Sequence, residues 1–168
     1  MVPASTFAQK YAATKSVVSF YSHATIEDIK AATTTSIGLA DLSTNAVAFS
    51  ITIKDFVFDK NLMQEHFNEK YMESEKYPKA TFQGKIEGFD ASKKGEQAVK
   101  AVGKLTMHGV TKDVELPGTM EAITDTSLSI KTTFTVKLED YKIKIPQVLW
   151  QNIAESIEVK VDFTLVKK

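Results

Sequence analysis

The chain has 168 residues, about the length of one domain, and its 43% hydrophobic and 25% charged residues are typical of a globular protein. Its 21 basic residues, all lysines, balance 21 acidic residues, so the chain lacks both the net positive charge and the arginine forks of nucleic-acid-binding proteins, and we expect no nucleic-acid partner. The absence of cysteine excludes disulfides, thiol nucleophiles and thiolate metal sites.

The N-terminal residues and the apolar runs bear on targeting. Residues 6–9, Thr-Phe-Ala-Gln, have the small-residue pattern of a signal-peptidase site but lack the preceding apolar segment. Residues 1–8 are therefore either a leader remnant or an ordinary frayed terminus, and we expect a single domain over residues 9–168. No apolar run approaches the roughly 18 residues of a membrane-spanning helix, so we expect no stable membrane insertion.

Apolar and polar residues alternate through most of the chain, which predicts β-strands with one buried face. Weak patterns at residues 16–21 and 36–42 precede a strong one at residues 45–53. The apolar positions then change parity, which predicts a bulge at Lys54 and Asp55. Short polar turns join most of the later strands. The later strands are predicted at residues 81–89, 97–107, 110–120, 128–138 and 157–165.

Two segments depart from the alternation. Met63, Phe67 and Tyr71 are spaced by four residues, which predicts a helix over residues 62–74 with Asn61 as its N-cap. Residues 142–153 contain Pro146 among apolar residues and are predicted to form a long connection with one helical turn. We therefore expect one or two short helices beside the strands.

The strands together predict an all-β fold, an eight-stranded antiparallel barrel, because hairpin-like connections favour closure of one sheet over the stacking of two. A barrel of this size either is filled by its own side chains or holds one small ligand. Gly84, Gly103, Gly118 and Ala101 are among the small residues predicted to face inward. They either leave room for a ligand or allow a tight barrel to bend, and the alternation does not decide between these interpretations.

A turn at His108 and Gly109 predicts the register of one hairpin, in which Leu105 pairs with Lys112. Lys112 then falls on the inward row near the rim. Its aliphatic stem can lie on an apolar wall while the ammonium group reaches solvent or the polar head of a ligand, and we expect it to reach solvent.

The sequence offers little for catalysis. His23, His66 and His108 are isolated, without a second ligand at a metal-binding spacing, so no metal site is predicted. His108 is expected to be structural, in a turn that needs left-handed backbone. The glutamates within residues 65–75 are expected to be solvated. No nucleophile, phosphate-binding or dinucleotide motif occurs, so we expect neither an enzyme nor a cofactor.

Residues 103–112, G-K-L-T-M-H-G-V-T-K, resemble the L-T-x-H-G-V-T-K signature of the YceI-like, polyisoprenoid-binding protein family. Residues 76–82, K-Y-P-K-A-T-F, are similar to that family's K-Y-P-x-A-x-F element, and Tyr71 and Met72 lie where family members carry paired aromatics. The resemblance runs from about residue 17 to the C-terminus. The family's R-D-x-H-L stretch is matched only at His66 and Phe67.

This resemblance implies a lipocalin-like barrel, periplasmic or secreted, around an apolar tube that accepts an isoprenoid quinone, a polyprenyl chain or a fatty acyl or amide chain. We therefore expect a non-catalytic protein that carries or sequesters a small apolar lipid, and a homodimer is left open. One alternative is an enzyme that uses Lys112 or His66 on a hydrophobic substrate. The other is a filled barrel that serves as a protein-interaction module.

The residues expected to contact the lipid lie on inward strand positions or near the opening of the barrel. They are Phe49, Ile51, Phe67, Tyr71, Met72, Phe82, Ile86, Leu105, Met107, Lys112, Val114, Phe134, Val136 and Trp150.

Overall fold

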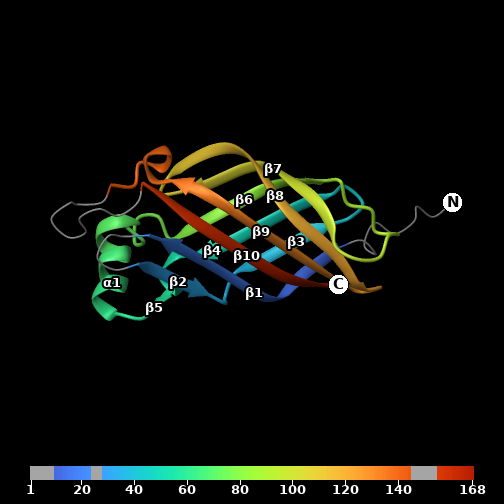
Figure 1. The fold of residues 1–168 in the computed structure, drawn as a ribbon, viewed down its shortest axis with the longest axis horizontal. Helices are drawn as coiled ribbons and strands as arrows, with labels where there is room; N and C mark the ends of the chain where they lie inside the picture. Colours follow the sequence, from blue (N-terminus) through green and yellow to red (C-terminus); the bar gives the residue numbers. More distant parts are fainter. Residues whose placement is uncertain (1–9, 24–27, 145–154) are drawn as a thin grey trace.

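The computed structural model describes residues 10–23, 28–144 and 155–168. Trp150, the segment of residues 1–8 and most of the predicted connection over residues 142–153 lie outside these ranges. Within them, the chain folds into a closed antiparallel β-barrel with one short α-helix at one end (Figure 1), which confirms the predicted fold class.

Eight strands close the barrel in the order β1-β3-β4-β6-β7-β8-β9-β10, because β10 also pairs with β1. Two shorter strands, β2 and β5, extend the sheet beyond β1. The bounds are β1 (Lys10–Ser22), β2 (Ile29–Thr33), β3 (Ile37–Asp41), β4 (Ala46–Thr52), β5 (Val57–Phe58), β6 (Lys79–Glu87), β7 (Gln97–Met107), β8 (Val110–Thr124), β9 (Ser127–Lys137) and β10 (Ser156–Lys167).

Each short strand lies in line with a barrel strand and is separated from it by a bend, β2 from β3 and β5 from β4. The first residues of β1 pair with β3 and its last residues with β2, both antiparallel, so β2 and β3 run in one direction along the same edge of β1. In the same way β4 pairs with β3 and β5 with β2. The bulge predicted at Lys54 and Asp55 is instead a 3₁₀ turn, η2 (Ile53–Asp55), because the chain must bend here from β3 toward β2.

The predicted helix is shorter than expected. α1 (Asn61–His66) continues as a π-helical turn, η3 (Phe67–Tyr71), and a 3₁₀ turn, η4 (Leu138–Tyr141), follows β9. Lys60, not Asn61, occupies the N-cap position and makes no capping side-chain hydrogen bond, because Asn61 is already in the helix. The residues with four-residue spacing are buried, so the apolar face of this segment covers one end of the barrel.

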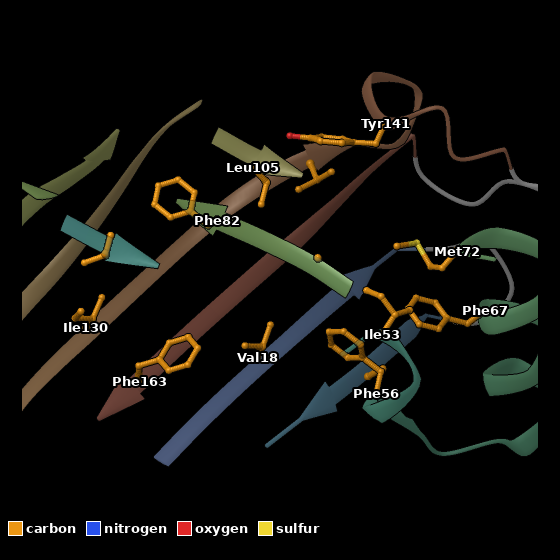
Figure 2. Close-up of a cluster of buried hydrophobic side chains, with 14 of the residues drawn as sticks. Val18, Ile53, Phe56, Phe67, Met72, Phe82, Leu105, Ile130, Tyr141 and Phe163 are labelled. Carbon is orange, nitrogen blue, oxygen red and sulfur yellow. The ribbon is translucent and has the colours of Figure 1, made fainter. Parts of the chain in front are cut away.

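The opposite half of the barrel is filled by its own side chains. We call it the packed half, defined by Phe49, Phe82, Ile130, Phe163 and Leu165. The side chains of Phe163 and Leu165 are fully buried, and the Phe49 ring lies 4.7 Å from that of Phe163 and 6.4 Å from that of Phe82, between centroids. Figure 2 shows Phe82, Ile130 and Phe163 together, away from the helix.

The mid-strand glycines belong to the curvature of the barrel. Gly84 of β6 and Gly103 of β7 face each other across the ladder. A Cβ atom on Gly84 would collide with the backbone oxygen of Val102, and one on Gly103 with that of Gln83. Glycine therefore lets two strands approach more closely than side chains would permit. Of the two interpretations left open by the alternation, the structure supports the bend and not the open interior at these positions.

Candidate functional site

The half of the barrel nearest α1 contains a partly open cavity of about 140 Å³. We call this part the hollow half, defined by the residues that line the cavity. Inward side chains of the strands form its wall, and the segments around α1, η3 and η4 cover it. The lining residues are Val18, Phe20, Ser22, Ile29, Ile51, Ile53, Phe56, Phe58, Met63, Phe67, Tyr71, Met72, Ala80, Leu105, Met107, Phe134, Leu138, Ile143, Ile157, Val159 and Val161.

The strand part of this wall follows directly from alternation and register. On β10 and on β1 beyond its irregularity at Ala13 and Lys15, every second residue faces inward, and the ladder places Val18 opposite Val161 and Phe20 opposite Val159. Branched aliphatic side chains on β10 are shorter than the phenyl ring of Phe163, which lies two residues beyond Val161. The wall is therefore thinner on the hollow half, and space remains inside it.

Four phenylalanine rings form the part of the wall nearest α1. The ring of Phe67 stacks on that of Phe20 at 5.3 Å between centroids and lies 5.0 Å from that of Phe58 and 5.8 Å from that of Phe56. Figure 2 shows Phe56 and Phe67 with Ile53 and Met72 beside the helix. These offset and edge-on contacts bind η2, β5 and η3 into one apolar cover over the cavity.

Two hydroxyl groups interrupt the apolar wall. Ser22 and Tyr71 line the cavity with 3% and 8% of their surface exposed, and neither hydroxyl has a hydrogen-bond partner within the described residues. Burial raises the pKa of Tyr71 to about 12, so its phenol stays neutral at physiological pH. No lysine, aspartate or glutamate lines the described cavity, so its wall offers no charge to a ligand.

His108 connects three segments beside the cavity. Its Nδ1 lies 2.9 Å from the backbone oxygen of Tyr141, and its Nε2 lies 2.8 Å from Oε2 of Glu73. The ring of Tyr77 packs on it at 4.8 Å between centroids. The backbone of His108 has a φ of 53°, which confirms the predicted left-handed turn. The side-chain contacts were not predicted, because their partners are more than 30 residues away in the sequence.

The predicted ligand-contacting residues divide between the two halves of the barrel. Those that line the cavity are Ile51, Phe67, Tyr71, Met72, Leu105, Met107 and Phe134. The others among the described residues lie outside its lining: Phe49, Phe82, Ile86 and Val136 in the core, Val114 half-buried, and Lys112 exposed to solvent. Contact with a ligand stays a prediction for all of them, and Trp150 lies outside the described residues.

Several lining residues were missed although the sequence carried a signal for them. Ile157, Val159 and Val161 follow the predicted inward parity of the last strand, and Phe56 and Phe58 follow the parity change after residue 53. Alternation identifies which face is buried. It does not identify how far along the barrel the space lies, so these positions could be recognised as inward but not as cavity wall.

The residues of the enzyme alternative do not meet in this site. Neither Lys112 nor His66 lines the cavity. The ladder does pair Leu105 with Lys112, as predicted from the turn. Among the described residues no group of three or more histidine, aspartate or glutamate side chains has the arrangement of a metal site. None of the helices formed by those residues is long and apolar enough to span a bilayer.

Comparison with known proteins identifies the family. The family model for the YceI-like domain matches residues 10–165, nearly the whole chain. The chain belongs to the YceI-like domain family. This confirms the resemblance drawn from the signature around His108. A search of curated proteins finds no match.

Solved structures show the same fold at low sequence identity. A polyisoprenoid binding domain from Saccharophagus degradans, implicated in plant cell wall breakdown, is 14% identical with a TM-score of 0.82, over 94% of this chain and 98% of that one. BcnA of Burkholderia cenocepacia is 18% identical with a TM-score of 0.73, over 89% and 95%. The YceI protein of Campylobacter jejuni is 18% identical with a TM-score of 0.61, over 77% and 78%.

Proposed function

We propose that this YceI-like protein binds a long apolar lipid in its barrel cavity, to carry or sequester it without catalysis. The lipid would be an isoprenoid quinone, a polyprenyl chain or a fatty acyl or amide chain. The observation that carries the proposal is the apolar cavity of about 140 Å³ inside a barrel whose other half is filled. Membership of the family and the description of the S. degradans domain as polyisoprenoid-binding support it.

The size of the cavity limits which part of a lipid it holds. An apolar cavity of about 150 Å³ stays dry and accommodates a benzene-sized molecule. The present cavity is therefore large enough for one ring or a short stretch of branched chain. Phe49, Phe82 and Phe163 block extension into the packed half. The remainder of a long chain would have to leave past the helix side of the barrel.

The chemistry of the wall limits the polarity of the bound part. Transfer of apolar groups from water contributes about 0.8 kcal/mol per buried CH₂, which is the driving force for binding here. A charged phosphate or carboxylate would lose its hydration without gaining a charged partner from the described wall. The part of the lipid inside the cavity is therefore uncharged, and the hydroxyls of Ser22 and Tyr71 are the groups available to a neutral oxygen atom.

Two measurements test this function. Mass spectrometry of an organic extract of the purified protein would identify a lipid retained from the cell. Fluorescence titration with all-trans-retinol, an uncharged isoprenoid alcohol, would measure uptake by the lipid-free protein. The variant Ala80→Leu adds a larger side chain to the cavity lining, and Ala32→Leu is the same change on the outer face of β2, where Ala32 pairs with the exposed Val57.

The expected result is that Ala80→Leu weakens retinol binding by about tenfold or more, because it fills part of the cavity. Ala32→Leu should leave binding unchanged. A wild-type protein that neither retains a lipid nor binds retinol would contradict the proposed function. Equal binding by both variants would show that retinol binds elsewhere.

Location and assembly are separate proposals. We infer a periplasmic or secreted location from the family resemblance, and cell fractionation with detection of the native chain tests it. A homodimer is likewise a proposal, and analytical ultracentrifugation over a range of concentrations tests it. A cytoplasmic fraction or a strictly monomeric protein would contradict the respective proposal.

A further inference from the structure

The contacts of His108 join the β7–β8 turn to two segments that are remote in the sequence. We call this group the His108 clasp, defined by the His108 ring, the Glu73 carboxylate and the backbone oxygen of Tyr141. The His108 side chain is only 8% exposed, whereas that of Glu73 is 47% exposed. The Tyr77 ring covers the His108 ring. Gly109 permits this, since a Cβ on Gly109 would lie 2.6 Å from the Tyr77 ring.

Each partner of the clasp adjoins the cavity wall. Met107 precedes His108, Met72 precedes Glu73, and Leu138 and Ile143 lie on either side of Tyr141 along the chain; all four line the cavity. The clasp therefore holds together the β7–β8 turn, the end of η3 and the segment around η4. A displacement of any of the three would move a side chain of the wall.

Two contacts hold the His108 ring, one at each nitrogen. Both ring nitrogens of His108 face oxygen atoms that accept hydrogen bonds, a carbonyl oxygen and a carboxylate oxygen. Hydrogen bonds to a carboxylate are stronger than those between neutral groups, and the covering Tyr77 ring shields the contact with Glu73 from water. Lys76 also approaches the Tyr77 ring, with its Nζ 5.3 Å from the ring centroid.

A lipid can reach the cavity by few routes through the described structure. Ladders join the strands of the wall except at β5, which pairs with β2 alone, and the packed half blocks the far side. The covering segments on the helix side are not strands of the barrel. Their attachments to it include the clasp and the hydrogen bond from the backbone N–H of Phe58 to Oε1 of Gln64, at 3.2 Å. Separation of these segments therefore widens the path into the cavity.

We propose that the His108 clasp is a positioning element that holds the β7–β8 turn, η3 and η4 around the cavity and thereby sets the rate at which lipid enters and leaves. This inference rests on the proposed lipid-binding function. Because the clasp does not touch the cavity interior, loosening it accelerates entry and release together. The affinity for the lipid then changes little, which separates the clasp from a residue that contacts the ligand.

The test compares two neighbouring carboxylates. Glu73→Gln removes the charge from the clasp, and Glu69→Gln makes the same change at an exposed position of η3. His108→Asn removes the ring but keeps a residue that tolerates left-handed backbone. Stopped-flow fluorescence with all-trans-retinol would measure entry and release, and titration would measure Kd.

We expect Glu73→Gln and His108→Asn to raise both rates by about fivefold or more, as loss of a hydrogen bond to a carboxylate implies. Kd should change less than about twofold, since the contacts with the lipid are intact. Glu69→Gln should behave as the wild type. If retinol binds but Glu73→Gln exchanges it no faster than Glu69→Gln, the clasp does not set the rate and the inference is wrong, while the proposed function stands.

Hydrogen exchange in the lipid-free protein gives an independent readout. The backbone N–H of Met72 donates to the oxygen of Phe67 at 2.8 Å, and that of Ile143 donates to the oxygen of Leu138 at 3.0 Å. Both amides should exchange faster in Glu73→Gln, and amides around Phe163 should not. Unchanged exchange at Met72 and Ile143 would contradict the clasp itself. A wild type that binds no lipid would instead overturn the proposed function, and the role of the clasp in lipid exchange with it.

Discussion

The two halves of the barrel are built from the same strands but have different interiors. On β10, Phe163 and Leu165 are fully buried against other side chains, whereas Ile157, Val159 and Val161 face the cavity. The alternation is the same along the whole strand, so it does not distinguish the halves. What differs is the volume of the inward side chains and the distance they must fill.

Close approach of the backbone adds to this difference. Gly84 and Gly103 bring β6 and β7 together, and Gly38 leaves space for the Phe49 ring, since a Cβ there would lie 2.9 Å from it. Glycine therefore narrows the packed half and admits an aromatic side chain at its centre. A barrel with apolar inward rows throughout can thus be solid at one end and hollow at the other.

The largest contrast is expected for truncation of an aromatic ring in each half. Phe163→Ala should lower the free energy of unfolding by about 3–5 kcal/mol, because a fully buried ring leaves a cavity behind. Phe134→Ala, in the cavity wall, should lower it by less than half as much, since that ring already faces empty space. Urea denaturation measures both. Equal losses would show that the hollow half is as tightly packed as the other.

Enlarging a buried alanine should change the free energy of unfolding in opposite directions in the two halves. Ala40→Val adds two methyl groups to the packed half and should lower the free energy of unfolding by about 1–3 kcal/mol. Ala80→Val adds them to the cavity wall, where they fill space, and should be neutral or stabilising by up to about 1 kcal/mol. Thermal and urea unfolding of the lipid-free proteins would decide. Destabilisation by Ala80→Val to the same extent would contradict the difference between the halves.

Removal of the Tyr71 hydroxyl should stabilise the lipid-free protein. The hydroxyl is buried without a hydrogen-bond partner in the described residues, so Tyr71→Phe should raise the free energy of unfolding by about 1 kcal/mol. Ser36→Ala is a matched control, because the hydroxyl of Ser36 is also buried and unpartnered but lies outside the cavity lining. Both variants should be more stable, and only Tyr71→Phe should alter retinol binding. A loss of stability in Tyr71→Phe would contradict this.

A pH dependence is expected from the same residue. Burial raises the pKa of Tyr71 from 10.0 to about 12 in the folded protein. The unfolded chain therefore ionises first as the pH rises, so the contribution of Tyr71 to stability is complete below its unfolded pKa and is lost between about pH 10 and about pH 12. Unfolding across this range should show a steeper fall for the wild type than for Tyr71→Phe. Parallel curves would contradict the prediction.

Much of the fold could be predicted because its signals are local. The alternation over residues 97–107 and 110–120 and the turn between them predicted the pairing of Leu105 with Lys112. The same reasoning missed β2, where Ile29, Ala31 and Thr33 alternate over only five residues, and replaced the η2 turn by a bulge. Short strands and bends depend on the partners that reach them across the sheet, so their signal in the sequence is weak.

The candidate site could be predicted only in part from such local signals. Phe67, Tyr71 and Met72 were predicted near an opening and do line the cavity. Phe49 and Phe82, equally apolar and equally inward, fill the packed half instead. The partners of His108 could not be predicted, because the contacts to Glu73 and Tyr141 form only when the chain has closed on itself.

The amino-acid pattern alone was sufficient for the barrel and for the register of its signature hairpin, because these follow from residue type and spacing along one or two strands. The position of the cavity, its size and the clasp beside it required the folded chain. They depend on how side chains from opposite walls meet. A cavity is the small difference between the volume inside the barrel and the volume that the inward side chains fill, and no single strand sets either of these.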